Sequence, residues 1–408
     1  MTVGAHQQDV ESYIAASIGQ VRKDAWGKPD LSSCPIVAAA EAKATLFDPS
    51  EDGRSAPWLA NSLDESAVPV MDLILEDSGL WAAMPRIQRD TLVMREELVR
   101  LDSVLDGDQV RILPRPVTAD LVEAVPDPRD PSRMVAVAEW QYRDGDWYAD
   151  TWSIRGVPAH RFHDREGRDV SEKFGLPAGG EVGDAYPVVG VDGRARLPYV
   201  LLHAALGTGA LFDPFSEIWL YDGTLQVSLQ WTFQGHILRS AAWAQRYTIG
   251  AEIGGITTSG NGAQQVVADP AVVLPLRAME GFDGSPSAGQ WTTTVDPAKV
   301  AEAVSIYERR LYSMAGMDPA DVQRVSGDPR SGYALEISRK SKEVQALRYA
   351  PIFQRPVTEL VTLAAVLANR ATGRAVVPES GWGVEFAPIR AIRERAAREA
   401  AATSGRTP

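Results

Sequence analysis

The chain has 408 residues, of which 45% are hydrophobic and 23% charged, which indicates a folded protein and excludes a chain disordered throughout. Its 41 Lys and Arg against 54 Asp and Glu give a net charge of −13, so the surface as a whole repels nucleic acid and anionic lipid. Cys34 is the single cysteine, which excludes an internal disulfide and a cysteine-based zinc site.

The N-terminal part predicts little regular structure. Residues 1–19 lack a basic start and a continuous apolar core, and no apolar run reaches about 18 residues. We therefore expect no signal peptide, no membrane span, and a soluble protein made in a cytoplasm. Residues 1–60 are polar and Ala-rich, and we expect a peripheral segment with one helix near 37–46. A helical pattern follows over 67–92, which Pro85 should break.

Residues 95–222 are predicted to be mainly antiparallel β structure. In the clearest segment, 134–155, apolar and aromatic residues alternate on both sides of an Asp-Gly pair. Both residues of such a pair can adopt positive φ, which closes a tight hairpin. The Asp-Gly pairs that join or precede predicted strands are Asp106-Gly107, Asp144-Gly145 and Asp192-Gly193.

Residues 225–247 fit either a strand or a helix. Apolar residues alternate from Leu225 to Phe233 as in a strand, but they also recur every four residues as far as Ile237. The uninterrupted length favours a helix. Residues 250–294, rich in Gly, Thr and Pro, then predict a small β insertion.

A second helix is predicted over 297–315. Asp296 is typical of an N-cap, Pro297 of the first helical position, and Gly316 of the residue that follows a helix. Residues 317–330 are predicted to form a loop.

A helical pattern then covers 331–372, where Pro351 and Pro356 should kink the helix. Residues 360–368 are apolar on nearly every side, which indicates burial. Residues 389–401 predict a basic surface helix. The stripe predicted to face the core at the start of the long helix is Ala334, Ile337, Ser341, Val344 and Leu347.

A search for catalytic motifs is mostly negative. A phosphate-binding P-loop needs Ser or Thr after its Gly-Lys, but the only Gly-Lys, at 27–28, is followed by Pro29. Neither G-x-S-x-G nor H-E-x-x-H occurs. We therefore expect a protein that is not an enzyme and has no metal and no cofactor.

Two weaker chemical signals remain. His160, His163 and Asp164 form H-x-x-H-D, which can bind a metal, but their turn-rich setting favours ordinary surface histidines. Carboxylates such as Asp144 or Asp146 would serve a β-rich hydrolase, but both belong to a predicted hairpin turn, which makes this alternative weak.

The order of elements carries a family resemblance. From Trp291 to Ala368 a helix, a Gly-rich loop, the element Ser331-Gly332-Tyr333-Ala334-Leu335 and a long helix with prolines follow one another. Upstream lies a β-rich region with a strand at 196–200. This order resembles that of portal proteins of tailed bacteriophages or gene transfer agents, over about residues 65–400.

The resemblance implies an α+β portal-protein fold with a β-rich wing, a two-helix stem, a small β clip insertion, a long kinked wing helix and a short helical crown. The implied parts are 61–222 with 332–372 as wing, 223–249 and 295–316 as stem, 250–294 as clip, 317–331 as tunnel loop, and 373–408 as crown, after the N-terminal segment 1–60.

The resemblance also implies a function and partners. Portal proteins form a ring, usually of twelve subunits, at one capsid vertex, and the ring is the channel for DNA packaging and ejection. The implied partners are further copies of this chain, the large terminase ATPase, a head–tail adaptor, the major capsid protein and scaffold, and non-specific double-stranded DNA, without a membrane. The implied location is the virion, after assembly in the cytoplasm of a bacterial host. A capsid-associated adaptor without a DNA-conducting channel is the alternative.

The resemblance assigns candidate residues to two regions. Those of the tunnel loop are Arg324, Ser326, Gly327, Asp328, Arg330, Ser331 and Gly332. Those of the clip, which would dock terminase and adaptor, are Glu252, Gln264, Asp269, Arg277, Glu280 and Asp283. Phosphate contacts by Lys and Arg add affinity, so a channel with few of them lets DNA pass. Arg324 and Arg330 would supply weak, sequence-independent contacts.

Overall fold

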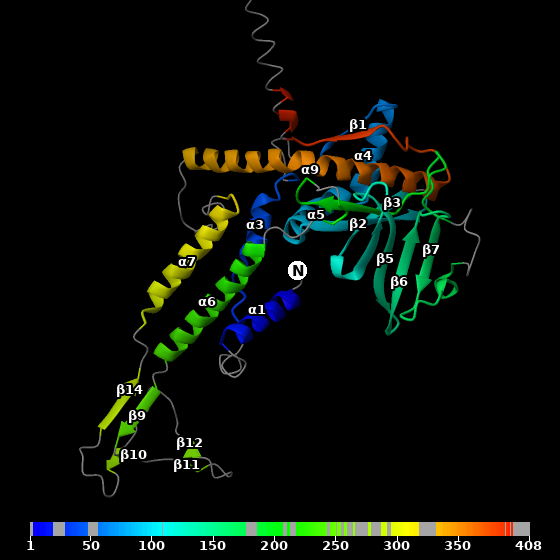
Figure 1. Ribbon diagram of the computed structural model, residues 1–408. Helices are drawn as coiled ribbons and strands as arrows, with labels where there is room; N and C mark the ends of the chain where they lie inside the picture. Colours follow the sequence, from blue (N-terminus) through cyan, green and yellow to red (C-terminus); the bar gives the residue numbers. More distant parts are fainter. Residues whose placement is uncertain are drawn as a thin grey trace, which may run out of the picture. The chain divides into compact units, whose positions relative to one another are not determined.

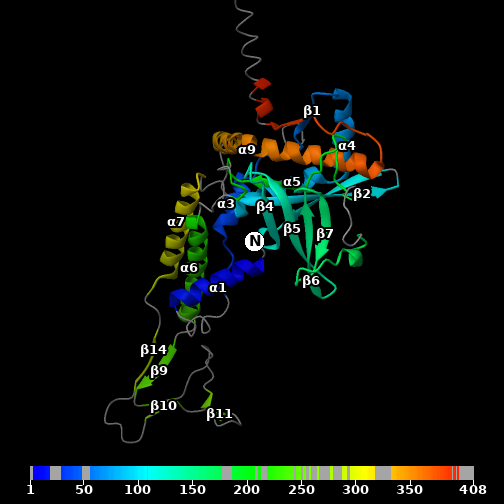
Figure 2. The ribbon, with the colours of Figure 1, turned by 45° about the vertical axis from the view of Figure 1, so that its right-hand side comes forward.

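The chain is described here by a computed structural model, and its parts form two compact units. The first unit contains residues 36–218 and 317–408, and the second contains 2–35 and 219–316. Figures 1 and 2 show the elements of both. The structure describes residues 3–18, 29–47, 56–107, 109–176, 186–206, 210–212, 218–242, 245–249, 251–253, 257–258, 264–265, 276–278, 287–291, 295–317, 332–387, 389–391 and 393–394.

The first unit mixes helices with antiparallel sheets. Its helices are α3 (Pro35–Lys43, which begins one residue before the unit), α4 (Val68–Asp77), α5 (Leu80–Met94) and α9 (Gly332–Thr372), with 3₁₀ turns η1 (Glu65–Ala67), η2 (Ala119–Leu121) and η3 (Ser171–Phe174). Its strands are β1 (Trp58–Asn61), β2 (Glu96–Asp106), β3 (Gln109–Val117), β4 (Val122–Pro126), β5 (Met134–Arg143), β6 (Asp146–Ser153), β7 (Ala159–His163), β8 (Tyr199–His203) and β15 (Trp382–Glu385). The mixed α and β content agrees with the predicted α+β class.

Two larger sheets, the small β1–β15 sheet and a layer of helices build the described part of this unit. One sheet has the strand order β3-β2-β8 and the other β4-β5-β6-β7, with every neighbouring pair antiparallel. Figure 1 shows α9 and α4 on one side of the β2–β3 hairpin and strands β5 to β7 on its other side. Side chains alternate between the faces of a strand, so β2 directs Val99 and Leu101 to the helices and Arg100 to the second sheet.

The predicted hairpins are confirmed. Asp144 and Gly145 adopt φ of 52° and 88°, the left-handed values that a two-residue hairpin turn requires, and β5 and β6 pair from Arg143 and Asp146 outwards. Gly107, in the turn between β2 and β3, has φ of 61°.

The predicted break at Pro85 is wrong. Helix α5 continues through Pro85, and the chain instead breaks at Gly79, whose φ of 70° is left-handed. A proline inside a helix removes one backbone hydrogen bond and costs about 3 kcal/mol. Here two residues close to it in the helix, Met84 and Ile87, are fully buried, and that burial offsets the cost.

Helix α9 is continuous from Gly332 to Thr372 and includes both prolines. The predicted burial of 360–368 is confirmed, because most of its side chains have no exposed surface. The predicted core stripe is wrong at Val344, which is 61% exposed, whereas Leu347 of the same stripe is half-buried. The buried face runs instead through Ala346, Tyr349, Ala350, Phe353 and Val357, in phase with the fully buried segment that follows.

The two ends of the first unit also correct the prediction. Leu46 and Phe47 belong to its core, and β1 pairs with β15, so residues 36–47 and 56–61 are not peripheral. The predicted helical C-terminal part contains strand β15, because Trp382 and Val384 alternate inwards against the core. The described residues after it, at 389–391 and 393–394, are helical.

The second unit contains two long helices and a strand-rich insertion. Its helices are α1 (Val3–Ile18), α6 (Ile218–Ala242, which begins one residue before the unit) and α7 (Pro297–Met314), and its strands are β9 (Gln245–Ile249), β10 (Ala251–Ile253), β11 (Thr257–Thr258), β12 (Gln264–Gln265), β13 (Leu276–Ala278) and β14 (Ser287–Trp291). Helix α1 was not predicted; its Val10 and Ile14 are buried against Leu225 and Leu229 of α6.

The helical interpretation of 225–247 is confirmed as far as Ala242. Residues 245–249 are strand β9 rather than helix, because Tyr247, Thr248 and Ile249 favour an extended chain and pair with β14. Helix α7 begins as predicted: the Asp296 side chain accepts from Ala298 N at 2.9 Å, and Gly316 adopts φ of 75° just after the helix.

Among the helices of the described residues, none is both long and apolar enough to span a membrane.

Candidate functional site

The strand insertion between α6 and α7 is the first candidate site. Strands β9 and β14 pair in antiparallel register, from Gln245 opposite Trp291 to Ile249 opposite Ser287, and so join the two helix ends through a two-stranded ribbon. Beyond it, β10 pairs with β13, and this register sets Glu252 directly opposite Arg277. Opposite charges at such positions stabilise a strand pair.

Only some of the predicted site residues belong to the described part of the chain. Gln264 lies in β12 opposite Thr258, and Gly332 is the first residue of α9. The predicted site residues that lie outside the described residues are Asp269, Glu280, Asp283, Arg324, Ser326, Gly327, Asp328, Arg330 and Ser331. The register therefore brings together one predicted pair, Glu252 and Arg277.

A buried carboxylate joins α6 and α7, the two helices that flank this insertion in the chain. Glu308 of α7 is 7% exposed, and its Oε1 accepts hydrogen bonds from Trp231 Nε1 of α6 at 2.8 Å and from Ser33 Oγ at 2.7 Å. Burial, with the nearby Glu308, raises the pKa of Tyr312 to about 12. The Glu308 contacts fix the rotation of α7 about its axis relative to α6.

A glycine lets the same two helices approach closely. A Cβ added at Gly223 of α6 would lie 2.6 Å from Leu311 Cδ2, and Leu311 is itself buried. Farther along, a groove of about 520 Å³ lies between α6 and α7, with Phe233, Ile237 and Val304 in its lining. Leu238, Val295 and Ile306 are roughly half exposed, so the two helices also present apolar surface to the outside.

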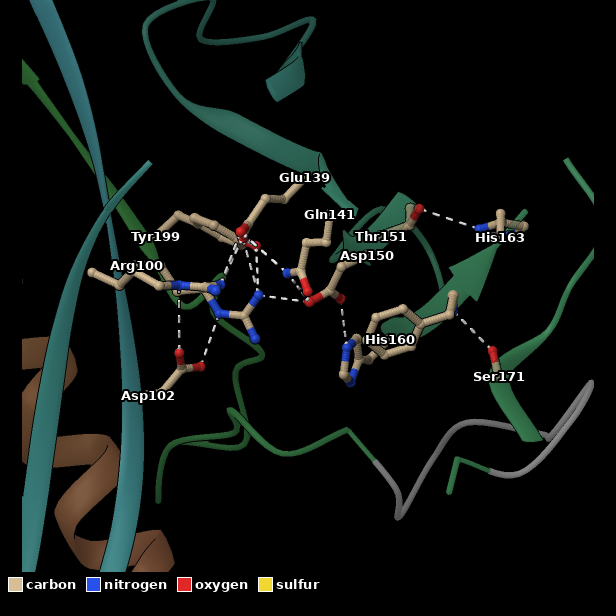
Figure 3. A network of polar contacts seen from close by, with 12 residues as sticks. Arg100, Asp102, Glu139, Gln141, Asp150, Thr151, His160, His163, Ser171 and Tyr199 are labelled. Carbon is tan, nitrogen blue, oxygen red and sulfur yellow. Dashed lines mark hydrogen bonds and ion pairs between the residues drawn. The ribbon is translucent and has the colours of Figure 1, made fainter. Parts of the chain in front are cut away.

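An ionic network between the two sheets of the first unit is the second candidate site (Figure 3). Arg100 of β2 donates from Nη1 to Asp150 Oδ2 at 2.6 Å and to Glu139 Oε2 at 3.1 Å. Tyr199 donates to the same Glu139 oxygen at 2.9 Å. Glu139 and Asp150 are 5% and 1% exposed, so these charges are removed from water.

More partners surround this centre. Arg115 contacts Glu139 at 2.9 Å, and Asp102 accepts from Arg100 Nε at 2.8 Å. His160 Nε2 lies 2.8 Å from Asp150 Oδ1, and its ring stacks on Trp152 at 3.6 Å. Each buried carboxylate therefore has more than one polar partner, as buried charges require.

The electrostatics keep the central pair charged. Burial alone would raise the pKa of Asp150, but the hydrogen bond from His160 and the charge of Arg100 outweigh it and lower that pKa. Burial opposes the charge on Arg100, but Tyr199, Asp150 and Asp102 raise its pKa overall. Burial, assisted by Glu139 and Asp150 against the opposing charge of Arg100, raises the pKa of Tyr199, which stays a hydroxyl and donates.

The prediction of ordinary surface histidines is wrong for His160. His160 stacks on Trp152 inside the network, while His163 Nδ1 lies 3.2 Å from Thr151 Oγ1, and Asp164 pairs with Arg168. The three residues of the H-x-x-H-D motif thus have separate partners. Among the described residues, no group of His, Cys, Asp and Glu has a geometry suited to a metal ion.

Sequence reasoning missed this network, although one signal pointed to it. Once Asp144-Gly145 is taken as a two-residue turn, Glu139 and Asp150 are equidistant from it and therefore opposite each other, as the register confirms. Two carboxylates at opposing positions repel unless a cation lies between them. Arg100, charged in the apolar run 98–101, is that cation.

Chemically, the network holds the two sheets together. Glu139 and Asp150 come from β5 and β6, whereas Arg100 and Tyr199 come from β2 and β8. Both carboxylates are buried and fully engaged, which suits a structural joint. Asp144 and Asp146, in the hairpin turn, are exposed.

Comparisons with known proteins give structural similarity without sequence similarity. The sequence matches no protein-family model and no curated protein. The structure is similar to a chain from the virion of a native gene transfer agent (GTA) particle, at 12% identity and a TM-score of 0.44, covering 92% of this chain and 86% of that one. It is also similar to chains from the neck of a native GTA particle with C12 symmetry (12% identity, TM-score 0.42, 89% and 83% covered) and from the neck of an empty GTA particle with C6 symmetry (12% identity, TM-score 0.38, 98% and 90% covered). All three TM-scores are below 0.5, so the proposed function rests on the chain's own elements.

Proposed function

We propose that this chain is the subunit of a portal-type ring at a capsid vertex, which conducts double-stranded DNA during packaging and ejection. The observation that carries the proposal is the order of elements: helix α6, a strand insertion on a β9–β14 ribbon, helix α7, and then the long helix α9. This is the order on which the resemblance to portal proteins was based. ATP hydrolysis belongs to a separate terminase in this proposal, so the chain itself needs no catalytic site.

The helix pair supports assembly into a ring. Leu238, Val295 and Ile306 are exposed on or beside α6 and α7 in a single chain. Large apolar side chains that one subunit leaves in water are suited to contacts with neighbouring subunits. The same argument applies to the groove between α6 and α7, whose lining is mainly apolar.

The charge of the chain supports DNA passage without tight binding. A ring of subunits that each carry −13 repels DNA over most of its surface. In the insertion, the register places the basic Arg277 opposite the acidic Glu252, so these two positions together add no net positive charge for phosphate. We assign to the insertion the docking of terminase and adaptor, and to residues 317–331 the contacts with DNA.

Assembly tests the proposal directly. Purified protein should form rings, expected to have twelve subunits, with an axial channel in negative-stain class averages and a matching mass by light scattering. The matched variants are Ile306→Glu, on the exposed face of α7, and Glu302→Gln, exposed on the same helix. Ile306→Glu should reduce ring formation and Glu302→Gln should not. Monomers under every assembly condition would contradict the proposal, and rings without a channel would indicate the adaptor alternative.

A deletion separates DNA conduction from assembly. Removal of residues 318–329 should leave rings intact and reduce the DNA packaged or retained per particle. Loss of the rings themselves would show instead that this segment is needed for assembly and would contradict its assignment to DNA contact.

A further inference from the structure

A groove in the first unit lies along one edge of the β3-β2-β8 sheet. It has a volume of about 730 Å³ and is bordered by β8, by α9 between Pro351 and Leu363, and by the segment that leads into β5. Most of its lining residues have apolar side chains. The proposed function does not use this groove, and of the network residues named above Tyr199 also lines it.

The backbone of β8 is open towards the groove. Leu101 N donates to Pro198 O, and Ala204 N donates to Arg95 O, both at 2.8 Å. Because bonded pairs alternate along an antiparallel ladder, Pro198, Val200, Leu202 and Ala204 direct their backbone groups to β2. The intervening residues, Tyr199, Leu201 and His203, therefore direct theirs away from β2, and no backbone hydrogen bond joins them to a further strand among the described residues.

The opposite edge of the same sheet is closed by prolines. By the same alternation, β3 directs Pro114 and Pro116 away from β2, and proline has no N–H to donate. Proline on an edge strand prevents pairing with another chain. No proline lies within β8, so this edge remains competent to pair.

The groove offers two walls for side chains of an added strand. Helix α9 contributes Ile352, Pro356 and Leu363 on one side. The ends of β5 and β6 contribute Met134 and Ile154 on the other. Side chains of a strand alternate between its faces, so a segment that extends the sheet beside β8 would place successive side chains against one wall and then the other.

Two arginines give the groove a positive charge. Arg133 and Arg355 line it and are exposed, and neither has a carboxylate within 4.0 Å among the described residues. The hydrogen bond from Ser132, assisted by the charges of both arginines, lowers the pKa of the nearby Asp130. Arg196 also lines it but is paired with Asp192 at 3.0 Å, and Glu359 is the one acidic lining residue. The lining therefore carries more basic than acidic side chains, which favours a ligand with a carboxylate.

We propose that this groove binds an extended segment of another protein, which adds to β8 as a further strand. The segment has apolar side chains that fill the two walls and at least one carboxylate that pairs with Arg133 or Arg355. Main-chain hydrogen bonds to Tyr199, Leu201 and His203 provide affinity, and the walls and arginines provide specificity. The proposal does not depend on ring formation.

Peptides test the strand geometry without altering the protein. The probe is a fluorescent seven-residue peptide of alternating Val and Thr with a central Asp, titrated into the full chain. Two versions carry N-methyl groups on alternate residues, one set for each edge of the peptide. Methylation removes N–H donors, so one set should weaken binding more than about tenfold, while the other set should change it less than about threefold. Equal effects of the two sets, or no saturable binding of the parent peptide, would overturn the proposal.

Charge reversal tests the carboxylate. The double variant Arg133→Glu with Arg355→Glu should weaken the Asp peptide about tenfold or more and strengthen a Lys version of it. Arg165→Glu, at an exposed arginine in the turn after β7, is the matched control and should change neither. Identical affinities in all variants would contradict the charge assignment. Self-association of the chain that the peptide competes away would show that the occupant is a second copy rather than another protein, and would overturn the proposal.

Discussion

The joints inside the two units differ in how they use buried polar groups. In the first unit, Arg100 connects two buried carboxylates from a neighbouring sheet, and each has several partners. In the second unit, one carboxylate, Glu308, receives hydrogen bonds from an indole and a hydroxyl, and Gly223 lets the two helices approach closely. Removing a partner from a buried charge costs more than removing a neutral hydrogen bond. The sheet joint should therefore tolerate substitution less than the helix joint.

The largest effect is expected at Asp150. Asp150→Ala leaves Arg100 buried without its closest carboxylate, which should lower the free energy of unfolding of the first unit by about 3–5 kcal/mol. Hydrogen exchange of peptides from β5 and β6 measures this locally, which is needed because a chain of two units need not unfold in one step. Glu166→Ala, which removes a partner of the exposed Arg168, is the control and should cost less than about 1 kcal/mol. Similar costs at both positions would contradict the importance of burial.

A smaller effect is expected at Glu308. Glu308→Ala leaves the Trp231 indole and the Ser33 hydroxyl without their acceptor and should lower the stability of the second unit by about 1–3 kcal/mol. Glu308→Gln keeps an acceptor oxygen on a side chain of the same length and should lower the stability less than Glu308→Ala does. Hydrogen exchange of α6 and α7 peptides measures the difference. If Gln costs as much as Ala, the joint depends on charge rather than on the hydrogen bonds.

Two glycines of α6 should respond in opposite directions. Gly223→Ala places a methyl group 2.6 Å from a buried Leu311 atom and should destabilise the second unit by about 1 kcal/mol or more. Gly235→Ala meets nothing within 4 Å and should stabilise the helix by about 0.5–1 kcal/mol. The double variant Gly223→Ala with Leu311→Ala should cost less than the sum of its parts. Additive costs would show that the contact does not limit helix approach.

Local chemistry in the sequence predicted much of the fold but little of the packing. The Asp144-Gly145 hairpin and the Asp296 cap depend on a few neighbouring residues, so the pattern alone was sufficient. The end of α6 was missed because β9 forms only by pairing with β14, about 40 residues later in the chain.

The polar network was missed for a related reason. Arg100, Asp150 and Tyr199 come from distant parts of the sequence, and no local motif links them. The hydrophobic periodicity also predicted the wrong buried face of α9 near Val344. The fully buried segment farther along the helix determines which side of the helix faces the core. Most of the predicted tunnel-loop residues lie outside the described residues and stay predictions.

An effect about as small as those of the glycines is expected at Glu97, a buried carboxyl of β2 for which, unlike Asp150, no ion pair is found in the described part of the chain. Burial, assisted by the charge of Asp90, raises its pKa from 4.5 to about 7. The folded state therefore retains a proton that the unfolded state releases, so the contribution of Glu97 to stability is largest below pH 4.5, falls as the pH rises to about 7, and is then constant. Partial screening by solvent limits the loss of stability to about 1 kcal/mol.

Glu97→Gln should remove this part of the pH dependence, measured by urea unfolding between pH 5 and pH 8, whereas Glu65→Gln, at an exposed position, should retain it. If the free energy of unfolding of Glu97→Gln changes with pH as in the unsubstituted protein, Glu97 is already ionised in the folded state. The fold would then tolerate a buried carboxylate in β2 without the cation that Asp150 requires.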